Sequence, residues 1–321
     1  MSAPALENKN TSLAVIRKQG AISLTVLEGQ LETHSSAALL NQYEKLEAAM
    51  KNVPDMFLIA IDRSGSGDND LPIMEKRIRE IRTSVGKEDC PVVMFGDANP
   101  SVHSRMWDEN EKLSGTTLNG DGNGHEGGLQ AVLWGLQQKG VKLEERDVES
   151  PPIHAFILTD EHADGALGER IRDDVAKTVT NEQATTIFKA FKVESQGVEG
   201  VNKKKAVDLD FDVKRSATAT SIEMITKTLK DAHVILHVIT PKTNLEDYPI
   251  TWGGETARET AGIYLLGQIW QGIATMTNGD WADLEEEFTM GGSNLAETVE
   301  AMKQAAIAPI KALLVDNLQQ D

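Results

Sequence analysis

Short runs composed almost entirely of apolar residues constrain the fold of this chain more than any other feature of its sequence. Four such runs, each five to seven residues long, are separated by longer stretches of mixed character. A run of this length is typical of a strand that is buried on both faces of a parallel sheet. The four runs are residues 56–61 (MFLIAI), 91–95 (PVVMF), 153–158 (IHAFIL) and 233–239 (HVILHVI).

Amphipathic segments lie between these runs. Residues 71–85 carry apolar side chains at alternating spacings of three and four, and residues 126–138 carry a similar stripe. Both patterns are expected of helices that cover a sheet. Because strands and helices alternate along the chain, we predict an α/β fold of the doubly wound, Rossmann-like type. Its central sheet should be mostly parallel, with helices on both faces.

Three segments fall outside this rhythm. The N-terminal extension predicts a strand at 21–27 and a helix at 36–50. A later stretch alternates apolar residues with aspartates, which is typical of a half-buried strand and predicts an inserted β-hairpin. The chain ends in a predicted C-terminal helix. The resulting divisions are residues 1–52, a main domain at 53–290 with its hairpin at about 186–214, and 291–321.

The chain is strongly acidic. It has 50 acidic against 32 basic residues and a formal net charge of −18. Such a protein repels phosphate backbones and anionic lipid, so we expect neither a nucleic-acid nor a membrane partner. Cys90 is the single cysteine, which excludes an intramolecular disulfide. Since we find no secretory signal and no apolar run approaching the roughly 18 residues of a membrane span, we expect a cytoplasmic protein.

The most informative polar residues follow the first apolar run directly. Asp62, Ser64 and Ser66 occupy alternate positions of a turn that contains glycine. In an open α/β sheet, ligands bind in the loops at the carboxyl ends of the strands. A carboxylate and two hydroxyls there offer the oxygen ligands that hard divalent cations prefer. Asp160, after the third run, would bring another carboxylate to the same edge.

This arrangement resembles the von Willebrand factor A (vWA) domain. The matching features are Asp-x-Ser-x-Ser at 62–66, a glycine-rich loop at 115–128 that opens a helix, and Thr-Asp at 159–160. Residues 270–284 are also similar to the family's last helix running into an edge strand. The resemblance extends over roughly 55–284, interrupted by the predicted hairpin.

The resemblance implies a metal-ion-dependent adhesion site (MIDAS) of the intracellular type. Ser64 and Ser66 would ligate Mg²⁺, or else Mn²⁺ or Ca²⁺, directly, and Asp62 and Asp160 would act through water. The sequence departs from the family in the second loop, where the usual threonine position falls on Asn123. The residues near enough to substitute for it are Thr116, Thr117, Asp121, His125 and Glu126.

Other motifs point elsewhere but lack their context. Gly122-x-Gly124-x-x-Gly127 matches a dinucleotide fingerprint, yet it does not follow a buried strand as that motif requires. An EF-hand beginning at Asp62 would need glutamate where Ile73 stands. The loops offer no nucleophile paired with a base, so we expect that the protein is not an enzyme.

The function implied by the resemblance is metal-dependent protein binding by an intracellular adaptor or scaffold. An acidic residue of the partner would complete the metal's coordination, and the partner could be an AAA+ ATPase or another assembly component. Two alternatives stay open. One is a metal-dependent phosphoryl-transfer enzyme on a similar sheet, although Ser64 stands where such enzymes commonly have a second aspartate. The other is a structural or assembly protein that keeps the fold without a working metal site.

Overall fold

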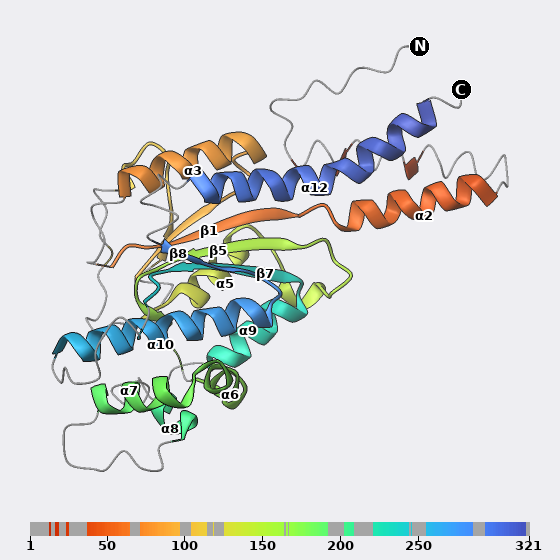
Figure 1. Ribbon diagram of the computed structural model, residues 1–321. Helices are drawn as coiled ribbons and strands as arrows, with labels where there is room; N and C mark the ends of the chain where they lie inside the picture. The colour runs from red at the N-terminus through yellow and green to blue at the C-terminus, as the bar shows by residue number, and fades with distance from the viewer. Residues whose placement is uncertain are drawn as a thin grey trace.

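The computed structural model of the chain has a six-stranded sheet at its centre, in the order β3-β2-β1-β5-β7-β8 (Figure 1). The structure describes residues 13, 17–18, 24–25, 37–64, 71–96, 104–113, 118, 125–163, 165, 167–191, 202–208, 221–243, 245, 255–284 and 293–318. The strands of the sheet are β1 (Met56–Asp62), β2 (Val92–Phe95), β3 (Ser104–Met106), β5 (Ile153–Leu158), β7 (Val234–Thr240) and β8 (Trp281–Asp283).

The four apolar runs form the inner strands of this sheet, as predicted. β2, β1, β5 and β7 are neighbours in that order and pair in parallel. β8 adds a parallel edge, whereas β3 pairs antiparallel with β2 at the opposite edge. Residues 56–61 of β1 are all buried, as expected of a strand that is covered on both faces. Because the inner strands run in one direction, their carboxyl ends lie at one edge of the sheet.

Helices cover both faces of the sheet (Figure 1). On one face lie α2 (Ala37–Lys51), α3 (Leu71–Val85) and α12 (Ser293–Leu318). On the other face lie α5 (Gly128–Gln138), α9 (Ile222–Asp231) and α10 (Glu255–Met276). The doubly wound α/β fold that the sequence predicts is therefore confirmed.

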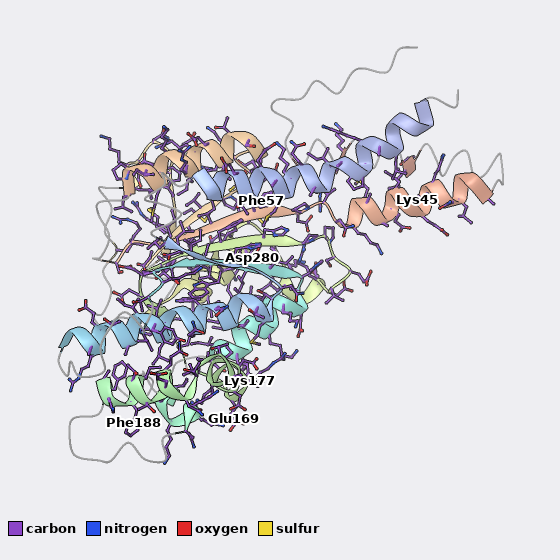
Figure 2. The ribbon with its side chains drawn as sticks, in the orientation of Figure 1. Lys45, Phe57, Glu169, Lys177, Phe188 and Asp280 are labelled. Atoms are coloured by element: carbon purple, nitrogen blue, oxygen red, sulfur yellow. The ribbon has the colours of Figure 1, made fainter. Side chains whose placement is uncertain are left out.

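Adjacent residues of β1 belong to different cores, because successive side chains of a strand point to opposite faces. Phe57, labelled in Figure 2, packs in one cluster with Ile78 of α3 and Ile307 of α12. Leu58 packs in the other cluster, together with Leu129 of α5 and Trp270 of α10. The sheet thus separates two apolar layers. The N-terminal helix α2 and the C-terminal helix α12 both contribute to the layer that contains Phe57.

The predicted helices at the two ends of the chain are present. α2 matches the helix expected at 36–50, and α12 includes most of the expected C-terminal helix. Of the strand expected at 21–27, only Leu24 and Thr25 are described, and they are helical, so the prediction is wrong at those two residues. Among the helices of the described residues, none is long and apolar enough to cross a membrane.

The inserted hairpin expected at 186–214 is wrong wherever the structure describes that segment. Residues 186–191 belong to helix α7 (Asn181–Phe191), and residues 203–208 form helix α8 (Lys203–Asp208). Of the remaining residues of the expected hairpin, Asn202 is described and lies in neither a helix nor a strand, and the others lie outside the described part.

The physical reason lies in the spacing of the buried residues of α7. Ala184, Ile187 and Phe188 are three and four positions apart, and all three are buried, so a helix places them on one side. A strand would have turned Ile187 and Phe188 to opposite faces. Together with α6 (Glu169–Thr178), α7 and α8 form an outer layer that packs against α10 (Figure 1).

Candidate metal centre

Three loops are predicted to bind the metal. The first, which follows β1, and the third, which follows β5, begin where two neighbouring parallel strands end. β1 ends at Asp62, and β5 ends at Leu158, directly before Thr159. The two strands pair in register, with Ile61 opposite Leu158. The next residue of each chain segment is therefore at the same edge, and Asp62 and Thr159 are in contact across it.

The carboxylate of Asp62 collects donors from both loops. Its Oδ1 accepts hydrogen bonds from the backbone N–H of Ser64 at 2.9 Å and from the Ser64 hydroxyl at 2.8 Å. Its Oδ2 accepts from the Thr159 hydroxyl at 2.5 Å. An ionised carboxylate can only accept, so both hydroxyl protons are directed to Asp62. Lone pairs on the Ser64 oxygen are thereby left for another electrophile.

The surroundings of Asp62 raise the pKa of its carboxyl group and so disfavour its ionisation. Burial raises the pKa of Asp62 to about 6, and the negative charge of Asp160 adds a smaller upward contribution. The hydrogen bonds from Thr159 and Ser64 act in the opposite direction. At neutral pH the carboxylate is nevertheless mostly charged, since its pKa stays below 7. A cation beside it would offset the cost of that buried charge.

Glu161 is a further acidic residue at this edge that our sequence analysis did not single out. Burial raises the pKa of Glu161 to about 7, followed by the negative charges of Asp160 and Asp62. Its backbone N–H donates to the Thr159 hydroxyl oxygen at 3.0 Å, which closes a tight turn around Asp160. The sequence signal was the adjacency of Glu161 to Asp160. The negative charge of Asp160 therefore raises the pKa of both Asp62 and Glu161 at the end of β1 and β5.

The end of the glycine-rich loop is joined to the third loop. A short two-stranded sheet pairs β4 (His125–Glu126) with β6 (His162–Ala163), with His125 opposite His162. The N–H of Gly127 donates to the carbonyl of Gly96 at 2.8 Å, beyond the end of β2. The exit of the second loop is therefore fixed beside the residues that follow Asp160.

The predicted site residues are only partly described. Asp62, Ser64 and Asp160 lie at the common edge of the sheet, whereas Ser66 and Asn123 lie outside the described residues. In the part of the chain that the structure describes, no three His, Cys, Asp or Glu side chains are grouped so as to hold a metal ion. An ion at this edge would therefore need hydroxyl oxygens such as that of Ser64. Carboxylates and hydroxyls together fit a hard cation such as Mg²⁺.

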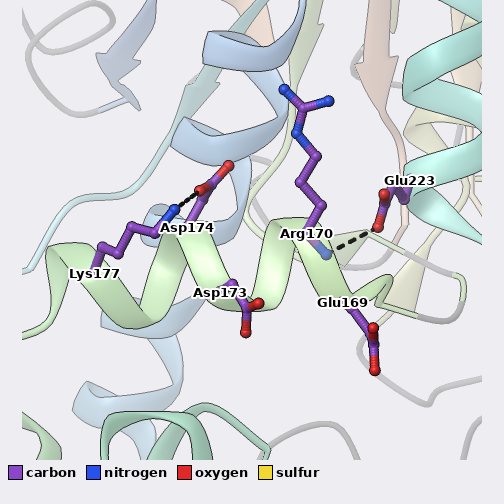
Figure 3. Close-up of a pocket in the computed structure, with 6 residues that line it drawn as sticks. All are labelled: Glu169, Arg170, Asp173, Asp174, Lys177 and Glu223. Atoms are coloured by element: carbon purple, nitrogen blue, oxygen red, sulfur yellow. Dashed lines mark hydrogen bonds and ion pairs between the residues drawn. The ribbon is translucent and has the colours of Figure 1, made fainter.

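A second polar feature is an open groove of about 550 Å³ between α6 and α9 (Figure 3). Within it, the Glu223 carboxylate accepts a hydrogen bond from the backbone N–H of Arg170 at 3.1 Å and so caps the start of α6. A Cβ at Gly168 would lie 1.9 Å from Glu223 Oε2, so glycine is needed there. Lys177 pairs with Asp174 at 2.7 Å. The Glu223 contact joins α9 to the start of α6, whereas the Lys177–Asp174 pair lies within α6.

A pair of histidines lies within the sheet. His154 Nδ1 and His237 Nε2 are 3.0 Å apart, and the N–H of Asp280, labelled in Figure 2, donates to His237 Nδ1 at 3.2 Å. His237 Nδ1 also lies 3.4 Å from the carboxylate of Asp280. Burial lowers the pKa of His154 to about 3, followed by the charges of His237 and His233. Burial also lowers the pKa of His237, and the ring of His237 stacks on Phe156. Both imidazoles are therefore neutral at physiological pH.

No protein-family model matches this chain, and a search of curated proteins found no match. The contacts around Asp62 are therefore the basis of the functional argument.

Proposed function

We propose that this chain is a metal-dependent protein-binding module of the vWA type, with a MIDAS-like site at the end of β1 and β5. One observation carries the proposal. The Asp62 carboxylate, whose pKa burial raises to about 6, orients the hydroxyls of Ser64 and Thr159 from two strands. A partly buried carboxylate that orients two hydroxyls beside further carboxylates offers the oxygen ligands that a divalent cation prefers.

The chain's own residues would divide the work. Ser64 would ligate the ion through its hydroxyl oxygen, because its O–H donates to Asp62 Oδ1 and leaves the oxygen lone pairs available. Asp62 and Asp160 would act through water, and Ser66 and Asn123 stay predicted ligands outside the described residues. A bound Mg²⁺, or Mn²⁺ or Ca²⁺, would supply an open coordination position for a carboxylate of the partner. The same resemblance suggests an AAA+ ATPase or an assembly component as partner, and binding without catalysis.

Calorimetric titration with Mg²⁺ tests the proposal. We expect the wild-type protein to bind the ion and to melt at a higher temperature in its presence, because a ligand that binds only the folded state stabilises it. Asp62→Ala should abolish both effects. A peptide with a single glutamate should then bind the wild-type protein in Mg²⁺ and dissociate in excess chelator.

Asp108→Ala is the matched control. Asp108 Oδ1 accepts from the backbone N–H of Asn110 at 2.9 Å and from its side chain at 2.8 Å, which reproduces the contacts of Asp62 with Ser64. It follows β3, near the opposite end of β2. This variant should lose its turn contact and keep the Mg²⁺ response. Wild-type protein that neither binds nor responds to Mg²⁺, Mn²⁺ or Ca²⁺ would contradict the proposal and favour a fold without a working metal site.

A further inference from the structure

Trp270 of α10 contacts the third loop, which follows β5, from the helix layer that contains α10. Its side chain is 1% exposed, and its indole Nε1 donates a hydrogen bond to the backbone carbonyl of Glu161 at 3.0 Å. Helix α10 also contacts β6, which follows Glu161. A residue more than a hundred positions away along the chain therefore fixes the backbone beside Asp160.

The backbone of Glu161 is held at both of its polar groups. Its carbonyl accepts from Trp270, and its N–H donates to the Thr159 hydroxyl oxygen at 3.0 Å. The Thr159 hydroxyl donates in turn to Asp62 Oδ2 at 2.5 Å. An unbroken series of hydrogen bonds thus runs from the Trp270 indole to the Asp62 carboxylate. Removing its first donor would free the turn on which the position of Asp160 depends.

The Trp270 ring also lies beneath the exit of the second loop. A Cβ at Gly128, the first residue of α5, would lie 3.5 Å from Trp270 Cη2 and 3.0 Å from Ile157 Cγ2. The indole edge is thus at ordinary contact distance from the start of α5, and the closer approach of Ile157 is what favours glycine there. One ring therefore contacts the segments that follow both the second and the third loop.

We propose that Trp270 is a positioning residue of the metal site, fixing the backbone of the third loop at Glu161 beside the start of α5. The proposal rests on the proposed metal-dependent function. Partners that orient metal ligands typically change metal affinity about 10- to 100-fold when they are replaced. Trp270 acts through Glu161 and Thr159, whose hydroxyl orders the Asp62 carboxylate.

Trp270→Phe tests the proposal, with Trp107→Phe as the matched control. Trp107 is also buried, and its indole Nε1 donates to a backbone carbonyl, that of Glu111, at 3.2 Å. It follows the opposite edge strand, β3. Both variants lose the same kind of hydrogen bond. We expect calorimetry at a temperature where all three proteins are folded to give Mg²⁺ binding at least about tenfold weaker for Trp270→Phe only.

A merely structural role for Trp270 would lower the melting temperature of metal-free protein in both variants and leave the Mg²⁺ dissociation constant unchanged. That result would overturn the proposal while leaving the proposed function standing. If wild-type protein binds no Mg²⁺, both fail together, so the two failures are distinguishable. If Trp270→Phe does not fold, Trp270→β-(3-benzothienyl)alanine keeps the ring's size and removes only the N–H donor. Unaltered affinity in that protein would likewise contradict the proposal.

Discussion

The two ends of strand β1 treat an aspartate in opposite ways. Asp55, just before the strand, pairs with the guanidinium groups of Arg17 and Arg146. Arg146 also donates to the carbonyls of Pro151 and Ala232, so this end is tied together by charge-assisted hydrogen bonds. Asp62 lies at the other end of the strand. Among the described residues, it accepts hydrogen bonds from neutral groups, namely the N–H and hydroxyl of Ser64 and the hydroxyl of Thr159.

If Asp62 holds a metal as we propose, the difference separates a structural from a functional use of the same side chain. At Asp55 the negative charge is compensated within the fold. At Asp62 the charge of Asp160 acts in the same direction as burial, and both raise the pKa of the carboxylate. Perturbed acidic groups gather at functional sites because binding or catalysis requires charges that the fold does not compensate. Asp55→Ala and Asp62→Asn contrast these two ends directly.

Asp55→Ala should have the largest effect on stability. Arg146 has a side chain only 13% exposed, and Arg17 is also partly buried, so removing Asp55 leaves both charges without their carboxylate. Breaking a buried ion pair in this way costs about 3 to 5 kcal/mol, and partial solvent exposure at Asp55 places our expectation at about 3. Urea denaturation measures the loss. The Mg²⁺ response should persist, and its disappearance would mean that the two ends are not independent.

Asp62→Asn should change the stability of the metal-free protein in the direction opposite to Asp55→Ala. The folded-state pKa of Asp62, about 6, lies above its ordinary value of 3.8, so the group favours the folded state most below pH 3.8. That contribution is lost as the pH rises towards 6, and the change integrates to about 3 kcal/mol at most. In chelator, the wild-type protein should therefore lose stability relative to Asp62→Asn between about pH 4 and 6. If wild type and variant differ in free energy of unfolding by the same amount across that range, the fold does not raise the pKa of Asp62.

His154→Gln should change acid sensitivity in the other direction. The pKa of His154 is lowered from 6.5 to about 3, so the unfolded state takes up a proton first as the pH falls. The stability that neutral His154 gives is present above pH 6.5 and declines towards pH 3. We expect the variant to lose about 1 to 2 kcal/mol less than wild type between pH 7 and 5. An equal loss in both proteins would assign acid sensitivity to other groups.

Much of the fold could be predicted from the sequence, because the inner strands bury both faces and leave unbroken apolar runs. Helix α3 was found for the complementary reason, since its five buried residues keep one helical stripe. The short strand β3 and the layer of α6, α7 and α8 were missed. β3 has three half-buried residues, too few for a pattern. In α7, the apolar spacing permitted a helix, and packing against α10 decided the outcome.

The candidate site could be predicted only where its residues follow those strands. Asp62 and Ser64 were found because they come directly after β1, and Asp160 because it follows β5. Trp270 was beyond the reach of sequence, because it meets Glu161 only through the packing of α10. A tryptophan in a helix predicts burial, and nothing in its neighbours along the chain indicates which carbonyl it will meet.

Anomalous diffraction from crystals grown with Mn²⁺ tests the central claim most directly. Mn²⁺ takes the same oxygen ligands as Mg²⁺ and can be located by its own signal. The account predicts a peak at about 2.2 Å from the Ser64 hydroxyl oxygen, within reach of Asp62 and Asp160 directly or through water. A peak elsewhere, or none at this edge of the sheet at saturating Mn²⁺, would contradict it.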